Sequence, residues 1–287
     1  MRWESGRRSS NVEDRRGRSA GPVGLGTGGI GMVLVVLLVS WLTGTNPLTL
    51  LQLAEQGAGP ASYEAPAGAP PADDAQAQFV SVVLADTEDT WGRLFAEGGQ
   101  RYAAPTLVLF TGAVDSACGR AGAAVGPFYC PGDHKVYLDL SFFQELAARF
   151  DAPGDFAQAY VVAHEVGHHV QNLLGVSEEV SRRQQRAGEV EANQLSVRLE
   201  LQADCFAGVW GYHADSRDLL EPGDVEEGLR AAAAIGDDEL QREGQGYVRP
   251  ETFTHGTSAQ RVEWLRRGLR EGRVGACDTF GGPASQP

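Results

Sequence analysis

The feature that most constrains this chain is a stretch of 36 residues, between Arg18 and Glu55, that contains no charged side chain. At its centre lies an apolar run of 13 residues, 30–42. A helix that spans a bilayer needs roughly 20 residues, and the glycines before the run are tolerated in such a helix. The stretch therefore predicts a single transmembrane helix over residues 23–45.

The net charge differs in sign on the two sides of this stretch. Residues 1–18 hold six of the 24 basic and three of the 38 acidic side chains, which gives this head a net charge of +3 and the rest of the chain −17. Because arginines are retained in the cytoplasm, we expect a single-pass protein of the cell membrane with a cytoplasmic N-terminus and an extracytoplasmic body. A cleaved signal peptide is the alternative, but no Ala-x-Ala cleavage site follows the apolar run.

The composition of the remaining chain indicates one folded domain. Residues 55 to about 75 are rich in Ala, Gly and Pro, which is typical of a linker. Of the whole chain 42% is hydrophobic, enough for a packed core. The acidic body excludes a general nucleic-acid binder, which needs clustered Lys and Arg. The predicted organisation is a basic head (1–22), the anchor (23–45), a linker (46–75) and an extracytoplasmic domain (76–287).

Apolar periodicity predicts an α+β domain that is mostly helical with a small sheet. Apolar stripes indicate helices near 76–97, 141–150, 154–174, 188–213, 225–235 and 258–271. Short β-type runs predict strands at 105–111 and 136–140, and the Gly- and Ala-rich residues between them predict a loop. We expect Trp91, Trp210 and Trp264 in the core.

The four cysteines, Cys118, Cys130, Cys205 and Cys277, all follow the predicted anchor. An exported body lies in an oxidising compartment, where an even number of cysteines favours two disulfides. Three pairings are possible. We favour Cys118–Cys130, which closes a short loop, and hence Cys205–Cys277, which would tie the C-terminus to the body. Buried free thiols are the alternative, and the absence of a Cys-x-x-Cys spacing disfavours a four-cysteine zinc site.

The motif that carries chemistry is His164-Glu165-Val-Gly-His168, within the predicted helix 154–174. Residues four apart lie on one face of a helix, so the two imidazoles can bind one ion. Glu165 lies roughly 100° further round the helix, where it can flank the metal without ligating it. There it can act as general base toward a zinc-activated water.

A catalytic Zn²⁺ needs a third protein ligand. The zinc proteases with three histidine ligands require Gly and His where this chain has Gln171 and Leu174, so that class is excluded. The predicted helix 188–213 offers Glu200 and Asp204, which are four apart among apolar neighbours, where carboxylates are costly unless paired or metal-bound. We expect Glu200 to bind Zn²⁺ and Asp204 to hold a histidine ligand by its other nitrogen.

Two further acids on the same predicted helix, Glu189 and Glu191, are rival ligands, but neither is followed four residues later by an acid. Cys205 is five residues from Glu200, about 140° round the helix. It should face away from the metal and remain available for a disulfide.

Several motifs together resemble the bacterial neutral zinc metallopeptidases. They are His164-Glu165-x-x-His168, Glu200-x-x-Ala203-Asp204, the opening residues 1–4 and 11–16, and residues 128–131 and 136–139, after a basic head and a single anchor. The resemblance covers nearly the whole chain except the linker. It implies a zinc peptidase of the wider gluzincin group, whose third ligand is a glutamate from a downstream helix.

Residues 254–261 are similar to the His-(Pro/Gly)-Ser…Arg segment of gluzincins such as the membrane CAAX and heat-shock proteases. By that likeness, His255 or Arg261 would lie near the zinc and stabilise an oxyanion or bind substrate. We expect the other histidines on the surface or in packing roles: His134, His169 and His213.

These observations predict a membrane-anchored zinc endopeptidase that acts on a protein or peptide substrate and contacts the membrane through its N-terminal helix, with no nucleic acid. The strand 136–140 is a hypothetical edge that binds an extended peptide through its main chain. One alternative is an inactive, metal-stabilised extracytoplasmic binding or scaffold domain, although a pure scaffold has no need of Glu165. Another is an anchored interaction protein with an accidental motif.

Overall fold

The computed structural model describes residues 1–17 and 68–281. The predicted anchor, 23–45, and most of the predicted linker lie outside the described residues. Within the described ranges, no helix combines the length and the apolar character that a bilayer crossing requires.

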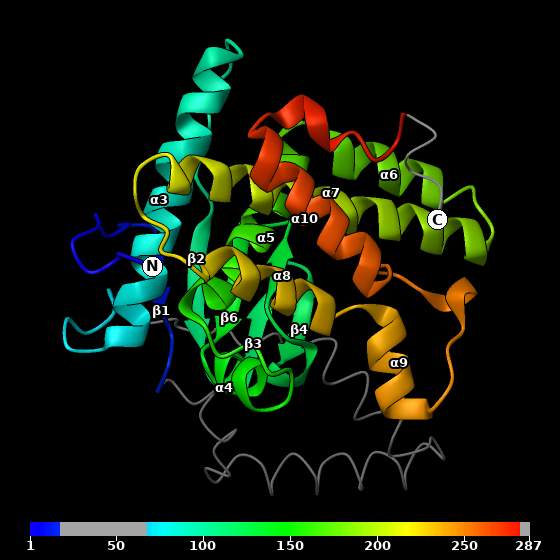
Figure 1. The fold of residues 1–287 in the computed structure, drawn as a ribbon, viewed down its shortest axis with the longest axis horizontal. Coiled ribbons are helices and arrows are strands. Elements are labelled where there is room, and N and C mark those ends of the chain that lie inside the picture. The colour runs from blue at the N-terminus through cyan, green and yellow to red at the C-terminus, as the bar shows by residue number, and fades with distance from the viewer. Residues whose placement is uncertain (18–67, 282–287) are drawn as a thin grey trace, which may run out of the picture. The chain divides into compact units, whose positions relative to one another are not determined.

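The described residues form an α+β structure in which helices surround a small sheet, as predicted (Figure 1). The helices are α3 (Ala75–Glu97), α4 (Ser141–Ala148), α5 (Asp155–Leu173), α6 (Val176–Gln184), α7 (Glu189–Asp215), α8 (Asp224–Ala234), α9 (Asp237–Gln245) and α10 (Ser258–Glu271). The strands are β1 (Val12–Asp14), β2 (Thr106–Phe110), β3 (Ala113–Ser116), β4 (Gly119–Gly122), β5 (Phe128–Cys130) and β6 (Lys135–Asp139). Three short 3-10 helices are η1 (Ala123–Val125), η2 (Pro250–Thr252) and η3 (Val274–Cys277).

Four of the strands form one sheet in the order β1-β2-β6-β5, and β3 pairs with β4 in a separate hairpin. β1, β2 and β6 run parallel, whereas β5 runs antiparallel to β6. The two central strands are buried on both faces. Leu107 and Val136 on one face join the main core, whereas Val108 and Tyr137 on the other face pack in a smaller cluster with Cys130.

The hypothesis that residues 136–140 form a peptide-binding edge is wrong. β6 lies between β2 and β5, and the terminal strands of the sheet in the described residues are β1 and β5. The sequence predicts a loop for Phe128–Cys130, because three residues after a Gly-rich stretch are too few to show a strand alternation. Only pairing with β6 makes this segment a strand.

The first 14 residues of the basic head belong to the domain. Residues 1–14 form one compact unit with the described residues from Ala69 onward, and β1 extends the sheet beside β2. Trp3 packs edge-on against Phe79 of α3, with ring centroids 5.3 Å apart. The sequence predicts that the head (1–22) and the domain lie on opposite sides of a membrane. The pairing of β1 with β2 differs from this prediction, because a bilayer cannot lie between two hydrogen-bonded strands.

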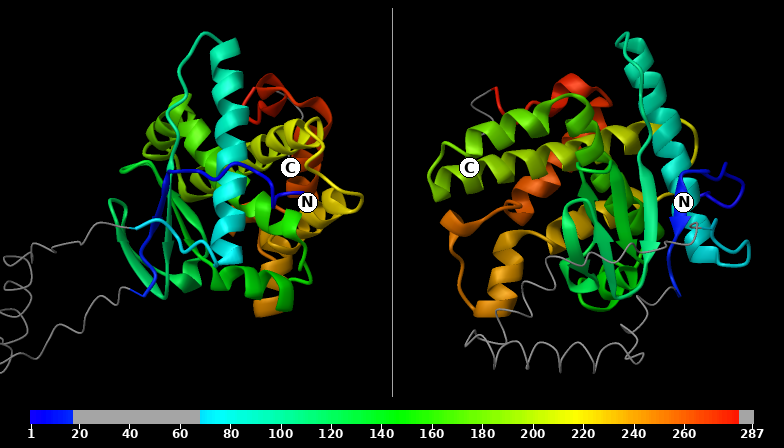
Figure 2. Two further views of the ribbon diagram at one scale, coloured as in Figure 1. Left: turned by 90° about the vertical axis from the view of Figure 1, so that its left-hand side faces the viewer. Right: turned by 180° about the vertical axis from the view of Figure 1, so that it is seen from behind.

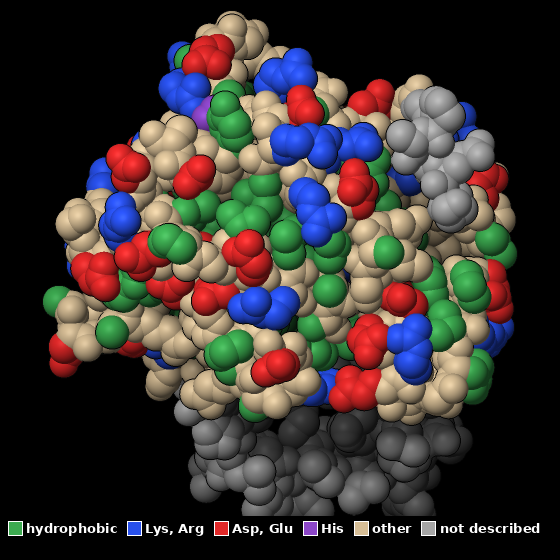
Figure 3. Space-filling model, viewed as in Figure 1, with side chains coloured by type: hydrophobic (Ala, Val, Ile, Leu, Met, Phe, Trp, Pro, Cys, Tyr) green, Lys and Arg blue, Asp and Glu red, His purple; other side chains and the backbone are tan. Residues whose placement is uncertain are grey.

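Ionic contacts also hold the head. The α-amino group of Met1 lies 2.8 Å from a carboxylate oxygen of Asp155, in the first turn of α5. Arg7 donates hydrogen bonds to Glu88 and Asp89 of α3. Acidic side chains gather on the part of the face in Figure 3 where Figure 1 marks the N-terminus. Part of the acidic excess of the body thus pairs with the basic excess of the head.

The helices at the metal site approach each other closely. The C-terminal helices α7, α8 and α10, yellow to red in Figure 2, lie together on one side of the sheet. A Cβ atom added at Gly167 of α5 would lie 2.9 Å from the backbone oxygen of Ala203 of α7. Glycine at this position therefore lets the two helices pack backbone to backbone.

Candidate metal centre

Two helices bring three potential ligand atoms together. α5 carries His164 and His168, and α7 carries Glu200. His164 Nε2 lies 3.2 Å from His168 Nε2 and 3.2 Å from Glu200 Oε2, and His168 Nε2 lies 3.4 Å from Glu200 Oε1. Zinc bonds of about 2.0–2.2 Å to nitrogen and oxygen imply a tetrahedron with edges of about 3.3–3.6 Å. These distances, which involve both oxygens of Glu200, are close to the edges of such a tetrahedron, and one atom from each residue lies within 4.8 Å of the other two.

Asp204 and Gln171 determine which imidazole nitrogens are left for a metal. Attraction to neighbouring positive charge outweighs the effect of burial and lowers the pKa of Asp204 to about 2, so its carboxylate accepts from His164 Nδ1 at 2.8 Å. Gln171 donates its amide to the carbonyl of Leu199 at 2.6 Å, which turns its Oε1 toward His168 Nδ1 at 2.9 Å. Both histidines therefore keep a proton on Nδ1 and direct Nε2 toward the shared point.

The charges around His164, His168 and Glu200 favour the binding of a cation between them. Burial alone would lower the pKa of His164, but the charges and hydrogen bonds of Asp204 and Glu200 outweigh it and raise the pKa to about 10. Glu200 is held ionised, with its pKa well below the usual range, because the two histidines outweigh the effect of burial. Two imidazoles and a carboxylate are a known ligand set of catalytic zinc, so the donor set fits Zn²⁺.

The two rival candidates for the third ligand lie far from Glu200 along α7. Glu189 and Glu191 are in the first turn of α7. At 1.5 Å per residue, they lie about 14–16 Å along the helix from Glu200. The group that could hold a metal contains only Glu200 from this helix.

Arg261 is engaged by Asp204. Its side chain is 3% exposed, and its Nε and Nη2 donate to both carboxylate oxygens of Asp204 at 2.9 Å. The hydroxyl of Tyr160 donates to Asp204 Oδ1 at 2.6 Å. A buried carboxylate with this many partners is compensated. The geometry therefore indicates that Arg261 holds Asp204 in place. The resemblance instead implied that Arg261 contacts an oxyanion or the substrate.

Glu165 lies beside the ligands in a cleft of about 680 Å³. It is only 8% exposed, and burial is the main cause that raises its pKa above the usual range. A carboxylate with a raised pKa can accept a proton and return it, as a general base and acid must.

His255 lines the same cleft from the segment before α10. Its Nδ1 lies 3.1 Å from Asp237 Oδ1, and Asp237 also accepts the backbone N–H groups of residues 254–256. The hydrogen bond to Asp237 is the main cause that raises the pKa of His255. Because Nδ1–H donates to the Asp237 carboxylate, Nε2 carries a hydrogen that His255 can offer to a substrate when the imidazole is protonated.

One wall of the cleft is formed by the chain around the edge strand. Nearly all of residues 124–131, which include β5, line it. Phe142 of α4 and Phe150 just after that helix also line it, and they make this part of the cleft apolar. The candidate metal ligands thus line a cleft that is bordered by a sheet edge.

The structure also tests predictions outside the metal ligands. Both favoured disulfides are present, Cys118–Cys130 and Cys205–Cys277, and the tryptophans at 91, 210 and 264 are buried as expected.

Sequence reasoning missed three site residues. Gln171 is three residues beyond His168, so its position on the ligand face was available from helical spacing. Tyr160 is four residues before His164, so the same spacing marks it, whereas no comparable signal in the sequence marks Asp237.

Comparison with known proteins agrees with this geometry. The chain matches the family described as "Putative neutral zinc metallopeptidase" over residues 1–280. It is 48% identical over 289 residues to the uncharacterized protein YpfJ of Escherichia coli K12, covering 98% of this chain and 99% of the relative. It is also 48% identical over 190 residues to the uncharacterized protein Mb2605 of Mycobacterium bovis, covering 62% and 63%. No solved structure matches. The chain therefore belongs to the neutral zinc metallopeptidase family.

Proposed function

We propose that this protein is a zinc-dependent endopeptidase. The observation that carries the proposal is the convergence of His164, His168 and Glu200 in a cleft that also contains Glu165: the two Nε2 atoms lie 3.2 Å apart, and each lies 3.2–3.4 Å from an oxygen of Glu200. A bound Zn²⁺ ion supplies Lewis-acid chemistry, which lowers the pKa of a water molecule and polarises a peptide carbonyl.

The chain's own residues supply the proton transfers. Glu165 accepts a proton from the attacking water and returns it to the leaving amine, so it serves as general base and then as general acid. His255 donates its Nε2–H toward the oxyanion that develops on the carbonyl oxygen. Asp204 and Arg261 keep His164 in its ligating orientation.

The cleft favours an extended peptide. In the sheet as described, β5 is a terminal strand with a partner on one side only, so its outer edge can pair with the main chain of a substrate. Phe142 and Phe150 offer a contact for an apolar substrate side chain. Unfolded or flexible protein segments are the proposed substrates.

The proposed site of action is an extracytoplasmic compartment. Two disulfides support it, because such bonds persist in oxidising environments. Membrane attachment through residues 23–45 remains a prediction. The pairing of β1 with β2 supports an attachment that leaves β1 and the domain on the same side.

The test is a comparison of Glu165→Gln with wild type and with Glu145→Gln, which makes the same change at an exposed carboxylate in the same cleft. We expect all three proteins to bind one zinc per chain. Casein cleavage should fall at least about 100-fold in Glu165→Gln, the scale of general base catalysis, and remain near wild type in Glu145→Gln. Zinc binding with no cleavage by the wild type would instead support the inactive scaffold.

A further inference from the structure

His169, the residue after the second metal ligand, faces the sheet. It lies about 100° round α5 from His168 and is 1% exposed. Its Nε2 lies 2.6 Å from the carbonyl oxygen of Ala103, so Nε2–H donates there and Nδ1 is left as an acceptor. The hydroxyl of Tyr129 lies 3.0 Å from this Nδ1 and donates to it.

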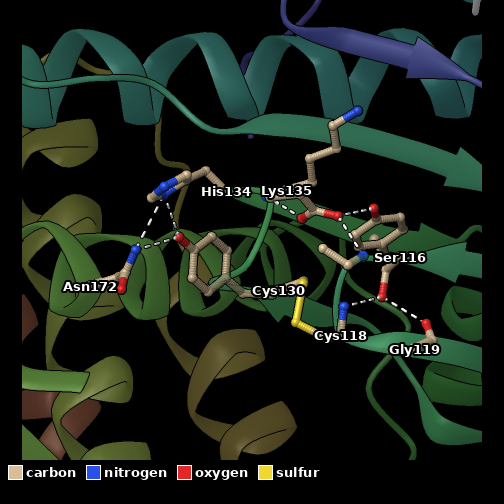
Figure 4. The surroundings of a disulfide bond; sticks show 11 residues. Ser116, Cys118, Gly119, Cys130, His134, Lys135 and Asn172 are labelled. Carbon is tan, nitrogen blue, oxygen red and sulfur yellow. Dashed lines mark hydrogen bonds between the residues drawn. A yellow bond between two sulfur atoms is a disulfide. The ribbon is translucent and has the colours of Figure 1, made fainter. Parts of the chain in front are cut away.

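Asn172, nearly one turn further along α5, supplies a second bond to the same hydroxyl. Its Nδ2 donates to the Tyr129 oxygen at 3.1 Å and reaches His134 Nδ1 at 3.2 Å. The pair of Asn172 and His134 is seen in Figure 4. Burial raises the pKa of Tyr129 to about 12, so the phenol stays protonated and keeps both bonds at neutral pH.

Tyr129 is the middle residue of the edge strand β5, which forms part of the cleft wall. Its neighbours Phe128 and Cys130 pack on the opposite face of the sheet, where Cys130 forms the disulfide with Cys118 (Figure 4). The short strand is therefore fixed on both faces, by a covalent bond on one and by hydrogen bonds to α5 on the other.

We propose that Tyr129, His169 and Asn172 are positioning residues that hold the substrate-binding edge β5 at a fixed distance from the metal ligands on α5. The inference rests on the proposed peptidase function. One helix carries both histidine ligands and two of the three hydrogen-bond partners of Tyr129, the third being His134 just before β6. A peptide bound along β5 is therefore placed relative to the metal by a single rigid element. A displacement of about 1 Å can cost about 100-fold in rate.

The test compares Tyr129→Phe with Tyr137→Phe. Tyr137 lies on the adjacent strand β6 and donates its hydroxyl to Asp133 at 2.7 Å, so each change removes one hydroxyl from the same sheet. kcat, KM and zinc affinity are measured with peptides of increasing length. In Tyr129→Phe we expect kcat/KM to fall at least 10-fold for peptides long enough to lie along β5 and far less for the shortest ones, with zinc affinity unchanged. Tyr137→Phe should resemble wild type.

Two results would overturn the proposal: wild-type kinetics in Tyr129→Phe at every peptide length, or an equal loss at every length together with loss of zinc. Hydrogen exchange of the β5 amides separates this inference from the proposed function, because it needs no activity. Exchange in β5 should accelerate in Tyr129→Phe and not in Tyr137→Phe. If the wild type cleaves no peptide but this difference is seen, the peptidase proposal fails and the attachment of β5 to α5 stands. Unchanged exchange contradicts that attachment.

Discussion

Each histidine ligand in this protein is oriented by a side chain that is itself held by a third group. Asp204 orients His164 and is held by Arg261, while Gln171 orients His168 and is held by the carbonyl of Leu199. Such partners fix the tautomer and raise the basicity of the ligand. The ion pair with Arg261 also explains how the Asp204 carboxylate is tolerated away from water.

The pair of His255 and Asp237 predicts the alkaline limit of activity. The hydrogen bond to Asp237 raises the pKa of His255, so the imidazolium persists above pH 6.5 and activity should decline as the pH rises through the raised value. Asp237→Asn removes the negative charge, which should return the pKa toward 6.5 and move this decline to lower pH. The measurement is kcat/KM as a function of pH.

Asp238→Asn is the matched control, because Asp238 is adjacent in sequence and bonds to Ser258 and not to His255. Its alkaline limit should equal that of wild type. An alkaline limit that stays in place in Asp237→Asn would show that His255 is not the group that titrates.

At the level of elements, the contact between α5 and α7 sets the distance from the histidine ligands to Glu200. Gly167→Ala places a methyl group 2.9 Å from the backbone oxygen of Ala203, where no side chain can move aside. We expect the free energy of unfolding to fall by about 1–3 kcal/mol, the usual cost of overpacking, and zinc affinity to weaken as the helices separate. Urea unfolding and zinc titration against a competing chelator measure the two effects.

Gly92→Ala provides the comparison. Gly92 lies within α3, and an added Cβ there meets no atom within 4 Å. This change should stabilise the protein by about 0.5–1 kcal/mol, since alanine loses less conformational freedom in a helix. Equal zinc affinity in Gly167→Ala and wild type would mean that the contact does not control the ligand spacing.

The elements that could be predicted from the sequence are those with an apolar stripe. The helices α5, α7 and α10 follow such stripes closely. By contrast, α6 buries only Val180 and α9 buries only Asp237, so neither shows an apolar period to detect. The strands β1 and β5 have only three residues each. β1 depends on pairing with β2, and β5 depends on pairing with β6.

The same limit applies to the site. His164, Glu165 and His168 could be proposed from helical spacing, and Glu200 from the need for a third ligand, its apolar neighbours and Asp204 four residues later. The bond between His255 and Asp237 spans 18 residues and a loop, and no local periodicity predicts it. Arg261 was singled out by resemblance, but its partner was visible only once α7 and α10 were packed together.

At the scale of the whole molecule, the head and the domain fold as one unit, so we expect both on the same side of any membrane. Ser5→Cys in the head and Tyr247→Cys in the domain place single thiols at exposed positions, while the native cysteines are in disulfides. A membrane-impermeant maleimide should label both variants under the same conditions in cells that express the full chain.

The two variants serve as controls for each other, because each reports whether the reagent reaches its own compartment. Labelling of both without permeabilisation places the unit outside the cytoplasm, and labelling of both only after permeabilisation places it inside. Labelling of one before and the other after permeabilisation would contradict the pairing of β1 with β2 in the cell.

The most direct measurement of the central claim is peptide hydrolysis by the full chain as a function of bound zinc. The protein is dialysed against a chelator, zinc is returned in steps, and the metal content and the cleavage rate are measured on the same samples. We expect the rate to vanish with the metal and to return in proportion to zinc, reaching its maximum at one ion per chain held by His164, His168 and Glu200. Cleavage that persists without zinc, or zinc binding at one ion per chain that restores no cleavage, would contradict it.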